Sequence, residues 1–153
     1  MSKTEFIEKI DSELKLIRTE AGFTQETMAQ IIGISKKTLV QIEKGRASLG
    51  WTGAVAVCTI FSQSTVLDRL LGGEASDMIR AYAFEDIKAP VYNKTMGGKV
   101  WWREIEKPEG YKVQQNIVSQ HYRILDDEDR RIFSSFDFGE ILERVRELER
   151  GSK

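Results

Sequence analysis

The sequence predicts an α+β protein, in which an all-helical N-terminal half is followed by a small antiparallel β-meander and one terminal helix. Apolar residues recur at helical spacing through most of the first 87 residues. Residues 89–98 then contain one of the two prolines and two glycines, and the chain beyond them is rich in β-branched and aromatic residues. A helical pattern returns after Asp137.

The first helix is predicted over residues 4–21, where Ser2 and Glu5 can form a capping box. Thr24 can cap a second helix that ends at Gly33, a residue suited to a tight turn with positive φ. Ser35 can cap a third helix that stops near Gly45. The residues expected to point inward are Phe6, Ile10, Leu14, Ile17, Met28, Ala29, Ile32, Leu39 and Ile42.

Three further helices are expected before the composition changes. Residues 51–61 are largely apolar and predict a buried fourth helix, and Ser64 can cap a fifth over residues 65–71. A sixth helical pattern over residues 78–87 must end before Pro90, because a proline disfavours helical backbone at the residue that precedes it.

The second half predicts four short strands, in residues 100–106, 111–118, 120–125 and 130–136. The run from Tyr111 to Leu125 is too long for one ordinary strand, and its apolar positions change parity, so we expect a bulge or bend near residues 116–120. Asp137, with Glu140 three residues on, can cap the last helix. Its expected apolar face is Ile141, Leu142, Val145 and Leu148.

The composition indicates a globular protein and argues against several functional classes. No apolar run approaches the roughly 20 residues needed to cross a bilayer, and the start lacks the layout of a signal peptide. Cys58 is the only cysteine, so we expect a cytoplasmic protein without an internal disulfide. Because Cys58 and His121 are the only residues of their kinds, we expect no metal centre with two or more such ligands in one chain. Cys58 lies in an apolar helix, where we expect a buried, inert thiol, and we therefore expect no cofactor and no catalytic activity.

Charge is unevenly distributed although the net charge is only −1. Residues 36–46 hold four basic side chains against the single Glu43, a local charge of +3, whereas residues 126–129 are all acidic. Local potential decides where a polyanion docks, so the overall balance is a poor guide to nucleic-acid binding.

The second and third helices are separated only by residues 33–35, so they must cross steeply. Ala29 is small enough to allow close approach at that crossing. Burying Leu39 and Ile42 leaves the opposite face of the third helix exposed, with Lys36, Lys37, Val40, Gln41 and Lys44. A rigid basic helix face of this kind suits the major groove, where lysine and glutamine can bind base edges.

Residues 14–61 resemble the Cro/CI-type (XRE-type) helix-turn-helix domain. The matching positions are Leu14, Arg18, Gly22, Thr24, Gln25, Ala29, Gly33, Ile34, Ser35, Leu39, Ile42, Glu43 and Gly45. The resemblance implies a lambda-repressor-like bundle of about five helices, in which the third helix, in residues 35–45, enters the major groove. It also implies an internal pair between Arg18 and Glu43 that bridges the first and third helices.

The resemblance also assigns roles to individual residues. Gln25 is expected to bind a phosphate, Lys36, Lys37 and Gln41 to contact bases, and Lys44 with Arg46 to flank the DNA backbone. The complete predicted DNA-binding set is Gln25, Ser35, Lys36, Lys37, Thr38, Gln41, Lys44 and Arg46.

Three segments are predicted: a helix-turn-helix DNA-binding domain over residues 1–72, a helix and linker over 73–98, and an α+β domain for dimerisation or sensing over 99–153. The expected function is sequence-specific binding of double-stranded DNA by a homodimeric transcriptional regulator, a repressor rather than an activator.

Two alternatives concern the second domain. It could bind a partner protein, as in an antitoxin-like protein, or an unknown small ligand. It could also bind RNA, because aromatic and basic residues alternate in the Trp101–Arg103 and His121–Arg123 segments and at Tyr111. The competing interpretation, which we favour, is that a small sheet needs these aromatics to cover its core.

Overall fold

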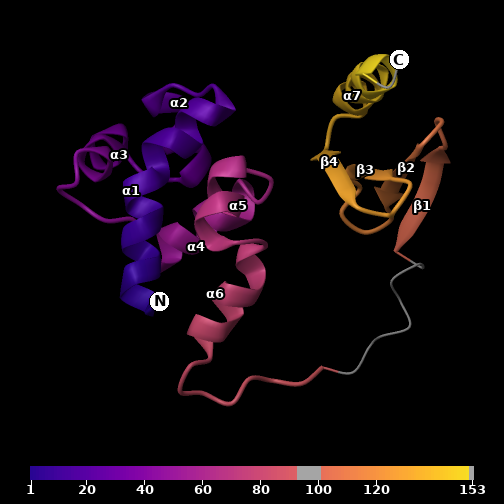
Figure 1. The fold of residues 1–153 in the computed structure, drawn as a ribbon. Coiled ribbons are helices and arrows are strands. Elements are labelled where there is room, and N and C mark those ends of the chain that lie inside the picture. Colours follow the sequence, from indigo (N-terminus) through magenta and orange to yellow (C-terminus); the bar gives the residue numbers. More distant parts are fainter. Residues whose placement is uncertain (93–100, 152–153) are drawn as a thin grey trace. The chain divides into compact units, whose positions relative to one another are not determined.

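The computed structural model describes residues 1–92 and 101–151, which form seven helices and one four-stranded antiparallel sheet (Figure 1). The predicted α+β class is confirmed. Internal contacts divide the chain into two units, Met1–Pro90 and Val91–Lys153. Part of the segment expected to connect the domains, residues 93–98, and Val100 at the start of the first expected strand lie outside the described residues.

Helix α1 (Lys3–Ala21) is fixed at both ends by local chemistry. Ser2 and Glu5 form the expected capping box, in which the Ser2 side chain accepts from the Glu5 N–H and the Glu5 carboxylate accepts from the Ser2 N–H. Gly22 ends the helix with φ of 77°, a left-handed conformation that glycine adopts at little cost.

Helices α2 (Gln25–Ile32) and α3 (Lys36–Glu43) begin at the caps that the sequence predicts. The Thr24 side chain accepts from the Thr27 N–H, and the Ser35 side chain accepts from the Thr38 N–H. The last helical residue of α3 is Glu43, and the chain turns through Lys44 to Gly45.

Helix α4 (Gly50–Ile60) is less buried than the sequence predicts. It turns one side, with Ala54, Val57 and Cys58, into the core, while Ile60 remains exposed. Its cap residue Leu49 has no capping side chain; the Gly50 N–H donates to the Ser48 hydroxyl, and the Leu49 N–H donates to the Asp11 carboxylate of α1, at 2.8 Å. This capping contact spans 38 residues of sequence and depends on the tertiary fold.

Helix α5 (Thr65–Leu71) has the predicted bounds, with Ser64 as its cap. Helix α6 (Ala75–Ala83) begins and ends earlier than the pattern over residues 78–87 suggests. It belongs to the N-terminal unit: the Tyr82 ring lies 5.4 Å from that of Phe6, and the Tyr82 hydroxyl donates to the Met1 carbonyl.

One hydrophobic core joins all six helices of this unit. Half of the largest side chains fully enclosed in it come from α1, which runs through the middle of the unit in Figure 1. Burial of a Leu, Ile, Met or Phe side chain stabilises the fold by about 1.5–3 kcal/mol. The buried members are Phe6, Ile10, Leu14, Ile17, Met28, Ala29, Leu39, Ile42, Ala54, Val57, Cys58, Val66 and Leu67.

Glu20, near the end of α1, ties α1 to the start of α5. Its carboxylate accepts from the Ser64 hydroxyl and from the N–H and hydroxyl of Thr65. These hydrogen bonds, that from Ser64 first, hold the pKa of Glu20 below its usual value. A lowered pKa in the folded state adds stability above the pKa of the unfolded chain, about 4.3, and this stability is lost as the pH falls through the folded value.

Glu20→Gln should therefore destabilise the N-terminal unit at pH 7, and the difference from wild type should shrink towards pH 3. Chemical unfolding followed by the indole NMR signal of Trp51, which packs on this core, measures the difference at each pH. Glu85→Gln, at an exposed carboxylate beyond α6, is the matched control. A pH-independent difference between Glu20→Gln and wild type would mean that the Glu20 charge contributes nothing to stability.

The second unit is a meander in which each strand pairs with the next, in the order β1-β2-β3-β4. The strands are β1 (Trp102–Glu106), β2 (Tyr111–Asn116), β3 (Tyr122–Asp126) and β4 (Arg131–Ser135). The bend expected near residues 116–120 is the hairpin turn between β2 and β3, and Gln120 within it has φ of 66°. Register shifts occur elsewhere, between Glu104 and Glu106 and between Ile124 and Leu125.

Helix α7 (Phe138–Gly151) packs on one face of this sheet, against β3 and β4. Asp137 accepts from the Gly139 N–H, but Glu140 does not complete a capping box with it. Instead, the Ser135 hydroxyl donates to Glu140 and accepts from the Asp137 N–H. The covered face holds a small core whose buried residues are Val113, Ile124, Ile141 and Val145.

Candidate nucleic-acid interface

In the tight turn between α2 and α3, one backbone carbonyl accepts two hydrogen bonds. The N–H groups of Gly33 and Ile34 both donate to the Ala29 carbonyl, at 2.9 and 3.0 Å, and Gly33 has φ of 88°. A β-carbon at this φ would be strained, so glycine is the residue that allows the turn. Ala29 itself is buried where the helices meet, as its small side chain predicts.

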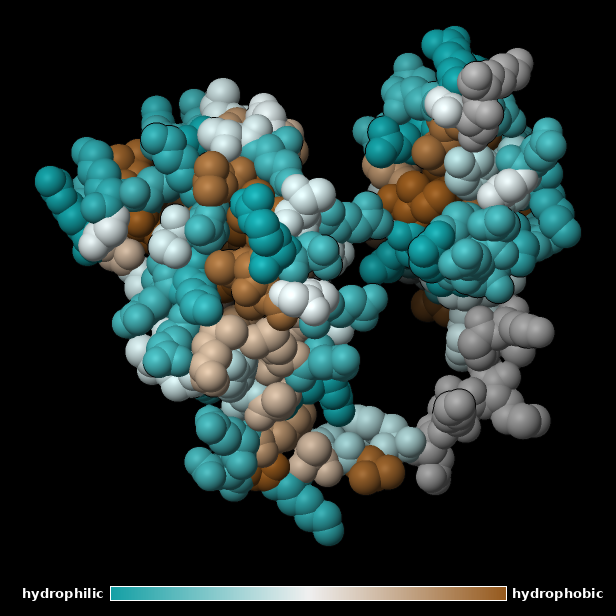
Figure 2. Space-filling model, in the orientation of Figure 1, coloured by the Kyte–Doolittle hydropathy of each residue, from teal (hydrophilic) through white to brown (hydrophobic). Residues whose placement is uncertain are grey.

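The two sides of α3 have different environments. Leu39 and Ile42 are buried in the core of the N-terminal unit. Lys36, Lys37 and Thr38, in the first turn of α3, are exposed. Hydrophilic residues project from the region of α3 in the space-filling view of Figure 2. The helix is therefore held by its inner side and presents its first turn to solvent.

Arg18 of α1 and Glu43 of α3 form an enclosed ion pair. The Arg18 Nη2 lies 2.7 Å from the Glu43 Oε1, the Nε donates to the same carboxylate, and the Nη1 donates to the Phe23 carbonyl at 3.0 Å. Only 12% of the Arg18 side chain and 5% of the Glu43 side chain are exposed. An ion pair this enclosed keeps its strength because water screens it little.

This pair changes the charge that residues 36–46 present to a ligand. Glu43 is the only acidic residue among them, and its carboxylate is turned inward and neutralised by Arg18. The charges left at the surface are those of Lys36, Lys37, Lys44 and Arg46, all of them exposed. The charged side chains that this segment exposes are therefore all basic, and its surface is more positive than its formal charge of +3 suggests.

Gln25 is the first residue of α2 and is half-buried. Its side-chain amide donates to Glu43 Oε2 at 3.4 Å, so it lies beside the Arg18–Glu43 pair. Gln25, Arg18 and Glu43 thus form one cluster that joins α1, α2 and α3.

A model of the helix-turn-helix family matches residues 14–50. This stretch runs from the middle of α1 to the first residue of α4 and includes the tight turn, the Arg18–Glu43 pair and the basic face of α3. Residues 14–50 are a helix-turn-helix domain. The expected resemblance is confirmed for this part of the chain, and the family is one of DNA-binding regulators. No curated protein and no solved structure matches the chain significantly.

The predicted DNA-binding residues lie in three environments within the helix-turn-helix domain. Lys36, Lys37, Lys44 and Arg46 have exposed side chains, and Gln41 on α3 is half-buried. Ser35 and Thr38 are exposed but hydrogen-bonded to each other, with the Ser35 hydroxyl donating to Thr38 Oγ1 at 2.8 Å. Gln25 is set apart from the others by its contact with Glu43. Their contacts with DNA stay predictions.

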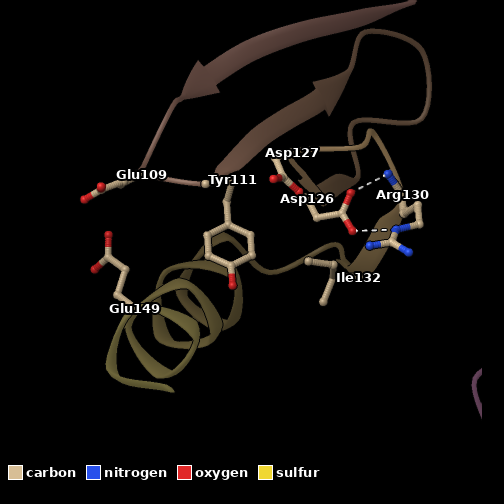
Figure 3. A pocket seen from close by; sticks show the side chains of 8 residues that line it. Glu109, Tyr111, Asp126, Asp127, Arg130, Ile132 and Glu149 are labelled. Atoms are coloured by element: carbon tan, nitrogen blue, oxygen red, sulfur yellow. Dashed lines mark hydrogen bonds and ion pairs between the residues drawn. The ribbon is translucent and has the colours of Figure 1, made fainter. Parts of the chain in front are cut away.

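The sequence did not indicate a cavity of about 680 Å³ in the second unit. The side chains of Glu109 and of Glu149 on α7 lie on one side of Tyr111, while Asp126 and Arg130 pair on the other side (Figure 3). Hydrogen bonds from the backbone of Arg130, then from its side chain, hold the pKa of Asp126 below its usual value. The sequence showed that residues 126–129, which contribute to one wall of the cavity, are acidic. It did not show that Glu149 also lines the cavity, because the position of Glu149 depends on how α7 packs on the sheet.

The aromatic cluster noted in the second half is divided between the two faces of the sheet. Tyr111 and Tyr122 pack against the core that α7 covers. Trp102 lies instead under the Arg123 guanidinium, 3.6 Å from the centre of its ring, and that guanidinium donates to Gln114 at 2.9 Å. The interpretation that these aromatics cover the core holds for the tyrosines but not for Trp102.

Cys58 lies in the core of the N-terminal unit, and burial raises the pKa of its thiol to about 11. The thiol is therefore protonated at neutral pH and a poor nucleophile. Within residues 1–92 and 101–151, no group of three or more histidine, cysteine, aspartate or glutamate residues could hold a metal ion. No helix in the same ranges has the length and apolar character required to cross a membrane.

Proposed function

We propose that this protein is a transcriptional regulator that binds specific duplex DNA sites through the exposed face of α3. The observation that carries the proposal is the arrangement of residues 36–46: apolar side chains anchor α3 in the core, the one acidic side chain is neutralised by Arg18, and four basic side chains remain exposed. An α-helix fits the major groove of B-DNA, where side chains can reach the base edges.

Each part of this surface has a separate role. Lys36, Lys37 and Gln41 are the base-contacting residues, because lysine donates to the purine acceptors of guanine and glutamine can pair with adenine. Lys44 and Arg46, in and after the turn that ends α3, neutralise phosphates. Gln25 at the start of α2 adds a phosphate contact from the side of the motif.

The protein acts as a homodimer on a two-fold symmetric site. One short helix makes too few base contacts for the specificity that a genome-wide search needs, and pairing two domains doubles them. The half-sites then lie about 10–10.5 bp apart, or a multiple of that, so that both α3 helices meet the same side of the duplex. Repression is the simpler mode of action, because a bound dimer can block a promoter without contacting another protein.

Binding measurements on a site selected from random duplexes test the docking face. Gln41→Ala should cost about 1–3 kcal/mol at the selected site and relax the preference at one base position. Lys44→Ala should weaken binding to all duplexes similarly and reduce the slope of log K against log salt by about one. The two effects differ because a base contact discriminates between sequences and a phosphate contact does not.

Lys88→Ala is the matched control, because Lys88 is an exposed lysine in the segment after α6 and lies outside the basic segment of residues 36–46. It should leave affinity and salt slope unchanged. If Gln41→Ala and Lys44→Ala both bind like wild type while remaining folded, α3 is not the docking face.

The same assay separates this function from the alternatives. An RNA-binding module would prefer single-stranded RNA to duplex DNA in competition, and an antitoxin-like protein would co-purify with a second chain. The local charge of the second unit argues against RNA there: residues 116–122 contain no lysine or arginine, and residues 126–129 are all acidic. A polyanion is repelled by such a surface.

A further inference from the structure

Several large apolar side chains of the second unit are exposed at one end of its sheet. Val118 is 71% exposed and Phe136 77%, and Trp101 and Ile117 are each about half exposed. All four lie where strands begin or end: Trp101 precedes β1, Ile117 and Val118 form the turn after β2, and Phe136 follows β4. Isolated apolar residues are ordinary on a protein surface, but a contiguous group marks an interaction site.

Contacts between these segments hold the residues at the same end of the sheet. The Ile117 N–H donates to the Trp101 carbonyl at 2.9 Å, which joins the turn to the start of β1. The His121 ring lies 5.0 Å from that of Trp102 and 5.8 Å from that of Phe136. We call this group, which consists of Trp101, Trp102, Ile117, Val118, His121 and Phe136, the apolar end of the sheet.

The apolar end differs in charge from the rest of its unit. Residues 116–122, which include three of its six members, contain no lysine, arginine, aspartate or glutamate, although residues 101–151 contain twenty-one of them; beside this stretch, the Arg123 guanidinium covers the ring of Trp102. Helix α7 buries other apolar residues, on the face of the sheet that holds Val113 and Ile124. The apolar end is thus not part of the core that α7 covers.

We propose that the apolar end of the sheet is the surface through which two copies of this chain form a dimer. In a two-fold dimer the same patch meets itself, so each charged side chain near the axis would face its own copy. A patch whose residues 116–122 carry no charged side chain meets this requirement, and aromatic side chains are enriched at interface centres. The inference rests on the proposed function, which requires two helix-turn-helix domains on one site.

A nucleic acid is a poorer occupant of this surface. The aromatic rings of Trp102 and His121 could stack on bases, but residues 116–122 contain no lysine or arginine to neutralise the phosphates of a bound strand. A second copy brings no phosphates and covers the apolar side chains directly.

The double substitution Val118→Asp with Phe136→Asp tests the surface in the full-length protein. Both side chains are largely exposed, so the fold of the monomer should survive, which circular dichroism checks. Two carboxylates per copy would be buried in the dimer, and the dimer dissociation constant should rise by about 100-fold or more. Sedimentation velocity over a concentration series measures it.

The matched control is Ile60→Asp with Ile87→Asp, which adds the same charge at exposed apolar residues of the N-terminal unit. This variant should dimerise like wild type. The proposal is overturned if the Val118/Phe136 variant remains a dimer, or if only the Ile60/Ile87 variant dissociates, which would place the interface on the bundle.

Failure of this inference can be told apart from failure of the proposed function. A monomeric wild type that binds its selected duplex overturns the dimer surface and leaves DNA binding by α3 in place. A wild-type dimer that the Val118/Phe136 substitutions dissociate, but that binds no duplex, supports the surface and overturns the proposed function.

Discussion

Replacing Glu43 with alanine should lower the free energy of unfolding of the N-terminal unit by about 3–5 kcal/mol, because it leaves the Arg18 guanidinium enclosed without a counter-charge. The Phe23 carbonyl is the other acceptor that Arg18 contacts, and a neutral carbonyl cannot replace a carboxylate. The Gln25 amide would lose its acceptor in the same variant. For a unit of this size, 3 kcal/mol corresponds to a fall in melting temperature of about 10 °C or more.

Thermal unfolding followed through Trp51 measures this effect in the N-terminal unit, because Trp51 packs on its core. Lys37→Ala is the control: Lys37 is exposed on the same helix, so its loss should change the melting temperature little while weakening DNA binding. Glu43→Gln should fall between the two, because glutamine keeps an acceptor for Arg18 but no charge. Equal melting of Glu43→Ala and Lys37→Ala would show that the ion pair does not stabilise the fold.

Ile124→Ala should unfold most of the second unit without unfolding the first. Ile124 is fully buried in a core with three other enclosed residues, and removal of such a side chain costs about 2–5 kcal/mol. A unit of this size has little stability to lose, because a small domain buries a smaller fraction of its surface. The loss should therefore approach the whole stability of the unit.

Indole N–H signals in an NMR spectrum distinguish the two units. Trp51 belongs to the N-terminal unit, whereas Trp101 and Trp102 belong to the second. In Ile124→Ala the Trp101 and Trp102 signals should move to unfolded positions while that of Trp51 stays in place. Glu143→Ala, at an exposed residue of α7 outside the apolar end of the sheet, should leave all three unchanged. Loss of the Trp51 signal in Ile124→Ala would show that the units do not fold independently.

Local chemistry accounts for what the sequence predicted well. The caps Ser2, Thr24, Ser35 and Ser64 act through hydrogen bonds to residues three positions away, so their spacing is visible in the chain itself. Helical spacing likewise identified Leu39 and Ile42 as buried. The helix-turn-helix match at residues 14–50 rests on the same short-range features.

At α4 and α7 the structure differs from the prediction, because contacts that the local pattern does not reveal fix the exposed side or the cap of the helix. Helix α4 is apolar along most of its length, and its sequence does not tell which side the other helices leave exposed. The start of α4 is held by Asp11, 38 residues away. At α7, the Ser135 hydroxyl accepts from the Asp137 N–H and donates to the Glu140 carboxylate, and these two hydrogen bonds replace the expected capping box.

The sequence by itself determined the order of helices and strands, the tight turn at Gly33 and the basic character of residues 36–46, because each depends on residues close together in the chain. Only the tertiary structure decided that Glu20 holds the start of α5, that Tyr111 and Tyr122 lie under α7 while Trp102 does not, and that Glu149 reaches the cavity beside Tyr111. Residues far apart in sequence meet there through the packing of whole elements, and packing depends on the shape and volume of all the side chains at once. For the same reason, the sequence alone did not indicate the apolar end of the sheet. Trp101, Val118 and Phe136 are spread over 36 positions, and only the pairing of the four strands brings them to one end of the sheet.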